Sequence, residues 1–242
     1  MSTLSLRCGS STASFDTKGA YLTALKTDAT NILFPAQLIG EKLRGGIPVC
    51  APIFGPGDSV GLKQHGFARD VDWKVVSRAD DEVVLSFEAK RGQELAEAYQ
   101  GCVMIYTVKI RENSLSLHLI IENKGEAAFV CSPGFHPYFP TEDATAVRVS
   151  ANKTYQFDAD ELAATQFLSP YIDNSTIDLG NVKVTLASSA LQQYAVWSAN
   201  PDTYICVEPT LAGNLDAQAI PPCLNSGEKA EFEMTLSWGK IV

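Results

Sequence analysis

Histidine is scarce in this chain, and the cysteine spacings typical of metal or redox sites are missing. The 242 residues contain three histidines and six cysteines, with no CxxC or HxxH pair. The cysteines are scattered singly, mostly in apolar segments, at positions 8, 50, 102, 131, 206 and 223. A chain of this length can build a core without disulfides. We therefore expect buried, reduced thiols and no metal site.

Positive charge is also in short supply. Nineteen basic residues stand against 28 acidic ones, a formal net charge of −9. This balance argues against nucleic acid or an anionic membrane as a partner, because both require a basic surface. The apolar runs are too short to span a bilayer, and the Ser/Thr-rich first 14 residues lack the apolar stretch of a signal peptide. We expect a cytoplasmic protein.

Nucleotide-binding motifs are not found, and a hydrolase motif is not found in its usual setting. The sequence has no Walker loop and no GxGxxG, and the GxSxG match at 57–61 (GDSVG) lies in a Gly/Pro-rich loop rather than between an expected strand and an expected helix. Phosphoryl transfer, dinucleotide binding and serine-hydrolase chemistry therefore have no support. Helical patterns are rare as well, since only residues 93–100 have a helix-favouring composition.

Alternation of apolar and polar residues dominates instead. In 114–123, for example, Leu115, Leu117 and Leu119 share one face and His118 lies on the other, so we expect this histidine to be exposed and uninvolved. Turn clusters separate several such runs. The pattern predicts one antiparallel all-β domain over 1–242, a β-sandwich with long loops. The expected strands are 71–77, 83–88, 103–111, 114–123, 182–186, 195–198, 204–207 and 232–238.

One loop, residues 44–69, is rich in glycine and proline. These residues interrupt regular structure and fix rigid turns. Binding residues are often carried on loops held in this way. Here the loop contains His65 and Arg69, four residues apart, and begins at Arg44. Each guanidinium offers a planar set of donors for sugar oxygens, carboxylate or phosphate. The alternative is that the arginines pair with Asp70 and Glu41.

His136 and Glu208 are the candidate acid and base. His136 lies in the aromatic segment FHPYF, where partial desolvation favours the neutral imidazole. Glu208 ends an apolar run and precedes Pro209, which predicts a carboxylate at the rim of a sheet with a raised pKa. The alternatives are a structural histidine and an exposed glutamate at the end of a strand.

Taken together, these segments resemble the glucose-6-phosphate 1-epimerases (hexose-6-phosphate mutarotases) of the aldose 1-epimerase, or galactose mutarotase-like, superfamily. The resemblance covers nearly the whole chain, but it is poor between 152 and 182. The matching segments are 19–22 (GAYL), 31–35 (NILFP), 43–50 (LRGGIPVC), 54–56 (FGP), 65–69 (HGFAR), 134–139 (GFHPYF) and 206–208 (CVE).

The resemblance implies a galactose mutarotase-like β-sandwich with a sugar in an open cleft. It implies that His136 is the general acid and Glu208 the general base of anomer exchange, without metal or cofactor. His65 would bind the sugar near its ring oxygen, and Arg44 and Arg69 would hold a phosphate. A sugar-binding aspartate is expected in the poorly matching stretch. Asp158 is our candidate, with Asp160, Asp173 and Asp178 as competitors.

The expected function is therefore a cofactor-independent mutarotase for an aldohexose, in particular a hexose 6-phosphate. Its partner would be the small-molecule sugar or sugar phosphate, and the protein would be a monomer or weak dimer. Two alternatives stay open: an aldose 1-epimerase for free sugars, and a non-catalytic carbohydrate-binding or sensing protein on the same fold. Retention of both His136 and Glu208 favours an enzyme, because a binder needs no acid–base pair.

Overall fold

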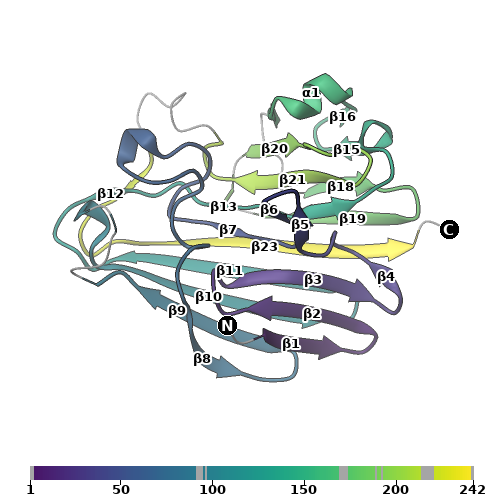
Figure 1. Cartoon of the computed structure of the whole chain (residues 1–242). Coiled ribbons are helices and arrows are strands. Elements are labelled where there is room, and N and C mark those ends of the chain that lie inside the picture. The colour runs from purple at the N-terminus through teal and green to yellow at the C-terminus, as the bar shows by residue number, and fades with distance from the viewer. Residues whose placement is uncertain are drawn as a thin grey trace.

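The computed structural model describes residues 3–90, 95, 97–168, 174–188, 190–191, 193–213 and 221–240. Within these residues the named strands pair antiparallel and form two layers (Figure 1). This confirms the all-β, antiparallel sandwich predicted from the alternating pattern.

A nine-stranded sheet makes one layer, in the order β16-β15-β18-β19-β23-β11-β10-β9-β8. Its strands are β8 (Lys74–Arg78), β9 (Glu82–Glu88), β10 (Cys102–Arg111), β11 (Ser114–Asn123), β15 (Arg148–Ser150), β16 (Thr154–Tyr155), β18 (Asn174–Asp178), β19 (Val182–Ala187) and β23 (Lys229–Lys240).

Two smaller sheets lie over the large one (Figure 1). The first has four strands: β1 (Thr3–Cys8), β2 (Ser11–Asp16), β3 (Tyr21–Thr27) and β4 (Thr30–Asn31). The second has the order β17-β20-β21-β13-β7, with β14 also paired to β21. Its strands are β7 (Val49–Cys50), β13 (Gly134–Phe135), β14 (Tyr138–Pro140), β17 (Gln166–Leu168), β20 (Gln193–Trp197) and β21 (Tyr204–Thr210).

The remaining elements are short. Two two-stranded pairs are formed by β5 (Gln37–Ile39) with β6 (Lys42–Arg44), and by β12 (Phe129–Val130) with β22 (Cys223–Leu224). The helices are α1 (Ala159–Ala163) and three 3₁₀ turns: η1 (Asp58–Val60), η2 (Glu97–Tyr99) and η3 (Ala144–Ala146). No helix of the described residues is long and apolar enough to cross a membrane.

The core fills the space between the layers. Successive side chains of a strand point to opposite faces, so β10 and β11 bury every second residue. Leu119 of β11, Phe15 of β2 and Val196 of β20 belong to one apolar cluster that draws on all three sheets. The large sheet thus forms the base on which the six-stranded sheet is held.

Several expectations from the sequence need correction. The strand predicted over 71–77 begins only at Lys74. Within the possible helix over 93–100, positions 93, 94 and 96 lie outside the described residues, and the helical part of the rest is the 3₁₀ turn Glu97–Tyr99. All six cysteines are free, but Cys223 is exposed and Cys8 is half-buried, because both lie near sheet margins. His118 lies, as expected, on the outer face, with Nε2 3.2 Å from Oε2 of Glu231.

Candidate active site

His136 occupies the short connection between β13 and β14. Its backbone N–H donates to the carbonyl of Pro48 at 3.2 Å. Its imidazole stacks on Tyr138 with ring centres 4.7 Å apart and 5° between the planes. Trp197 meets the same ring edge-on, with centres 6.2 Å apart. Aromatic rings therefore fix the orientation of an imidazole that is only 6% exposed.

Glu208 lies in the interior of β21, which corrects the prediction of a carboxylate at a strand end. The strand continues through Pro209, paired with Tyr194 of β20. On the other side of β21, β14 pairs as far as Cys206 and β13 resumes only at Thr210. Pro209 falls within this interruption, where its missing N–H costs no ladder bond on that side. His136 occupies the connection across the same interruption, so the two side chains meet.

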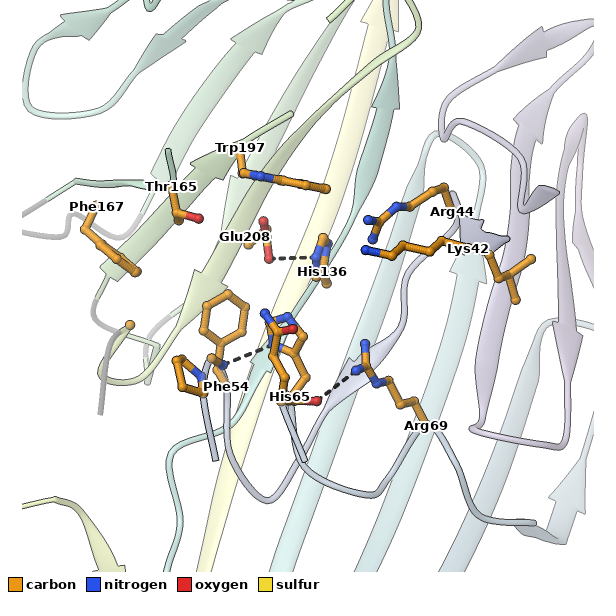
Figure 2. A pocket seen from close by; sticks show the side chains of 15 residues that line it. Lys42, Arg44, Phe54, His65, Arg69, His136, Thr165, Phe167, Trp197 and Glu208 are labelled. Atoms are coloured by element: carbon orange, nitrogen blue, oxygen red, sulfur yellow. Dashed lines mark hydrogen bonds and ion pairs between the residues drawn. The ribbon is translucent and has the colours of Figure 1, made fainter. Parts of the chain in front are cut away.

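The two candidate catalytic groups are in direct contact (Figure 2). Nε2 of His136 lies 3.2 Å from Oε2 of Glu208. The approach lacks hydrogen-bond geometry, and neither that oxygen nor Nδ1 of His136 has a hydrogen-bond partner among the described residues. Two buried polar groups at the edge of a cavity thus lack hydrogen-bond partners, and a ligand could provide them.

Burial governs the protonation of this pair. It raises the pKa of Glu208 well above its ordinary value, while the Arg44 guanidinium acts in the opposite direction. Burial also lowers the pKa of His136 well below its ordinary value, and the neighbouring His65, Arg69 and Arg44 lower it further. The favoured resting state is a carboxylic acid beside a neutral imidazole. Because the two groups are coupled, they titrate as a pair.

His65 reaches the same cavity through a tight turn. Its φ is +67° and that of Gly66 is +71°. A Cβ on Gly66 would collide with the carbonyl of Ala51, so this position requires glycine. The Gly55 N–H donates to Nδ1 of His65 at 3.0 Å. Burial, with Arg69 and Arg44, lowers the pKa of His65 to about 3.

Three cations line the cavity. The Arg44 guanidinium lies 5.0 Å above the ring of Trp197 and donates to the hydroxyl of Tyr138 at 3.4 Å. Arg69 donates to the backbone carbonyl of Gln64 at 2.8 Å. Lys42 precedes Arg44 by two residues on β6 and also faces the cavity (Figure 2).

No carboxylate neutralises these cations among the described residues. Asp70, one alternative partner of the arginines, instead lies 3.9 Å from Lys63. Within the part of the chain that the structure describes, no ion pair involves Lys42, Arg44 or Arg69. In a protein of net charge −9, this is a local positive site.

The cavity has a volume of about 720 Å³, within the usual range for small-molecule sites. Glu208 is the only acidic residue in its described lining. The lining residues are Lys42, Leu43, Arg44, Phe54, Gly55, Pro56, Gln64, His65, Arg69, His136, Thr165, Phe167, Trp197, Glu208 and Gly213.

The structure therefore brings together five of the six predicted site residues and leaves Asp158 apart. Asp158 caps α1, where its side chain accepts from the N–H of Glu161 at 2.8 Å. Asp160 and Asp178 do not line the cavity either, and Asp173 lies outside the described residues. The sequence carried the signal for the cap, an aspartate followed three residues later by a glutamate.

Apart from Gly213, four lining residues were missed from the sequence. Lys42 could have been predicted, because it lies two residues before Arg44 on one strand and therefore on the same strand face. Thr165, Phe167 and Trp197 carried no local signal, since pairing between strands distant in sequence brings them to the site.

Comparison with known proteins shows the family and the fold. The model of the aldose 1-epimerase family matches residues 2–178. A Salmonella typhimurium protein named "Putative glucose-6-phosphate 1-epimerase" is 30% identical over 146 residues, which are 57% of this chain and 48% of that protein. The Escherichia coli K12 protein of the same name is 31% identical over 146 residues, with the same coverage of both chains.

The matched segment therefore spans about half the length of these curated relatives. The crystal structure of a galactose mutarotase-like protein from Lactobacillus casei superimposes with a TM-score of 0.83, covering 98% of this chain and 100% of the other at 16% identity. At that identity the superposition shows a shared fold. With most of its length matched by the family model, the chain belongs to the aldose 1-epimerase family.

Proposed function

We propose that this protein is a mutarotase that interconverts the α and β anomers of an aldohexose, specifically a hexose 6-phosphate. The observation that carries the proposal is the contact of 3.2 Å between His136 and Glu208 at the edge of a cavity lined by three cations that form no ion pair with the described residues. An opposed acid and base suit proton transfer, and the cations suit an anionic substituent. We further propose a single-domain, cytoplasmic monomer or weak dimer that needs no cofactor.

Anomer exchange requires two proton transfers. Glu208 as carboxylate removes the proton of the C1 hydroxyl, while His136 as imidazolium gives a proton to the ring oxygen O5. The C1–O5 bond breaks and C1 becomes an aldehyde. After rotation about C1–C2, the O5 hydroxyl attacks the other face of the carbonyl, and both protons return. Each positioned transfer contributes roughly 10²–10⁴-fold to the rate.

The direct contact of the pair has a role in this cycle. The resting state favoured by burial, a carboxylic acid with a neutral imidazole, has the same number of protons as a carboxylate with an imidazolium. In the first state, Glu208 can protonate the aldehyde oxygen of the open-chain sugar and His136 can accept the proton of its O5 hydroxyl. In the second state, Glu208 can accept the proton of the C1 hydroxyl of the ring form and His136 can protonate O5. One proton moved from Glu208 to His136 converts the first state into the second, and Oε2 and Nε2, 3.2 Å apart, need only turn into line for this transfer. The site can therefore accept either form of the substrate.

The position of the cations supports a phosphate on C6. Figure 2 shows the ends of Lys42, Arg44 and Arg69 on the same side of His136. In a pyranose, C6 is attached to C5, which is bonded to the ring oxygen. A sugar that places O5 at His136 thus directs its C6 substituent toward the space beside this residue. Three cations there suit a phosphate dianion.

His65 would orient the sugar. Because Nδ1 accepts the Gly55 N–H, the neutral imidazole carries its proton on Nε2 and can donate to a sugar oxygen. Trp197, Phe54 and Phe167 supply apolar surface for the C–H faces of the ring.

Magnetisation-transfer NMR tests the substrate class. The rates of α/β exchange are measured for glucose 6-phosphate, glucose and galactose, with and without the protein. Acceleration of glucose 6-phosphate well above that of the free sugars supports the proposal. Equal acceleration of all three would assign the protein to free aldoses, and binding without any acceleration would make it a sugar carrier or sensor.

A further inference from the structure

Cys206 is a buried nucleophile that the proposed reaction does not use. It precedes Glu208 by two residues on β21, so both side chains lie on one face of the strand. The thiol is fully buried, next to Tyr138 and Tyr204 in a small apolar cluster. Its sulfur, an imidazole nitrogen of His136 and a carboxylate oxygen of Glu208 all lie within 4.8 Å of one another.

These three groups are the donors of a transition-metal site. Thiolate, imidazole and carboxylate are the ligands that zinc takes in proteins, at about 2.0–2.3 Å from the metal. Around a tetrahedral ion with one sulfur ligand at those distances, the ligand atoms stand roughly 3.3–3.5 Å apart. The 3.2 Å between His136 and Glu208 is close to this spacing. The sulfur needs to close in by about 1.3 Å at most. The fourth position would face the cavity, where water can bind.

Charge favours a soft ion over a hard one. A divalent ion with one thiolate and one carboxylate is neutral as a unit, so it can be held in a buried place. Magnesium and calcium prefer all-oxygen ligand sets and would bring uncompensated charge beside Arg44 and Arg69. The donor set therefore selects zinc and its chemical relatives.

We propose that Cys206, His136 and Glu208 form an inhibitory site for a soft divalent metal such as Zn²⁺. The ion displaces two protons to solvent, one from the Cys206 thiol and one from the Glu208 carboxylic acid, and binds the sulfur, the carboxylate and the imidazole, so it occupies both the acid and the base. It is a reversible inhibitor rather than a resident cofactor. The inhibition rests on the proposed mutarotase function, whereas metal binding does not.

Cobalt(II) tests binding independently of activity. Cobalt bound to a thiolate shows a charge-transfer band in the near ultraviolet. We expect this band in the wild-type protein at one equivalent of Co²⁺, and its loss in Cys206→Ala. Cys223→Ser is the matched control, because Cys223 is an exposed thiol on another strand, β22, that must not be the source of the band. Absence of the band in wild type, or its persistence in Cys206→Ala, overturns the site.

Zinc inhibition is then measured as the ratio of exchange rates with and without Zn²⁺ within each variant, so that differences in basal rate cancel. We expect near-complete loss in wild type, recovery on adding a chelator, and little loss in Cys206→Ala. Mg²⁺ and Ca²⁺ should have no effect. His118→Ala removes an exposed histidine that lies beside two glutamates and should leave zinc inhibition unchanged. Equal zinc inhibition of wild type and Cys206→Ala contradicts the proposal.

If no sugar exchanges at all, the proposed function fails while the cobalt spectrum still decides the metal site.

Discussion

The backbone N–H of Gly55 donates to Nδ1 of His65 at 3.0 Å. This bond can form only when Nδ1 is unprotonated, so the fold binds the neutral imidazole and directs Nε2–H into the cavity. Burial also favours the neutral imidazole, since it lowers the pKa of His65 to about 3. Substrate recognition and the acid stability of the fold are therefore linked through one side chain.

The first prediction concerns stability at acid pH. The folded pKa of His65 is depressed, so below about 6.5 the unfolded chain binds a proton that the fold does not, and stability falls as the pH falls. Between pH 7 and pH 5 this residue should cost about 2 kcal/mol of unfolding free energy. His65→Asn should reduce the loss by that amount, and asparagine tolerates the positive φ at this position.

Urea unfolding at pH 7 and pH 5 measures this difference. An unchanged pH dependence in His65→Asn would show that His65 can be protonated in the folded protein.

The second prediction concerns the phosphate. Arg69→Ala and Lys42→Met should each weaken binding of glucose 6-phosphate about tenfold or more, because a charge-assisted hydrogen bond contributes roughly 1.5–3 kcal/mol. Binding of glucose should change little. Calorimetric titration of both ligands gives the comparison, and equal losses for the two sugars would mean that these residues do not bind the phosphate.

Arg44 needs a separate test, because its guanidinium also stacks on Trp197 and donates to Tyr138. Arg44→Lys keeps the charge but loses the planar donor set. If Arg44 binds phosphate through paired hydrogen bonds, this variant should weaken glucose 6-phosphate while leaving glucose binding close to wild type. Full retention of affinity would indicate that charge alone matters at this position.

A third prediction links phosphate binding to catalysis. The positive charges of Arg69 and Arg44 are among the causes that lower the pKa of His136, after burial and His65. A bound phosphate compensates these charges, so it should raise the pKa of His136 and favour the imidazolium needed for ring opening. Proton NMR titration with glucitol 6-phosphate, which cannot form a ring, measures this shift.

The imidazole signal of His118 is the internal reference, because that residue lies on the opposite, outer face and should not respond to the ligand. A bound analogue that leaves the His136 titration unchanged, or moves it to lower pH, would contradict the link between phosphate and acid.

A fourth prediction concerns the thiols, for which the structure revises the uniform burial expected from sequence. Cys223 is exposed and should react rapidly with a thiol reagent in the native protein, while the four buried cysteines should react only after unfolding. Burial raises the pKa of Cys102 to about 12, which further suppresses its thiolate. Counting reactive thiols in wild type and Cys223→Ser checks this. More than two rapidly reacting thiols in the native wild type would show that the core opens readily.

The sequence predicted the sheets well because their signal is local. Strict alternation at Leu115, Leu117 and Leu119 identifies one buried face without knowledge of the partner strands. The rigid loop carrying His65 was predictable for a similar reason, since glycine and proline restrict the backbone wherever they occur.

The continuation of the strand past Glu208 could not be predicted from a local pattern. Pro209 normally indicates the end of a strand, yet β21 continues because its neighbour changes from β14 to β13 at that point. That change depends on pairing between segments about 70 residues apart, and no local pattern encodes it. Trp197 was missed for the same reason. Asp158, by contrast, was chosen in a poorly matching stretch, where its capping pattern gave a nearer explanation.

The central claim is that Glu208 acts as the base opposite His136. Glu208→Gln is nearly isosteric and remains uncharged, as the buried carboxyl is in its favoured state, so the fold and sugar binding should persist. The measurement is α/β exchange of glucose 6-phosphate by magnetisation-transfer NMR in wild type and in this variant, with binding confirmed by calorimetry. We expect exchange to fall by roughly 10²–10⁴-fold while the affinity changes little. Exchange at the wild-type rate in Glu208→Gln would contradict the account.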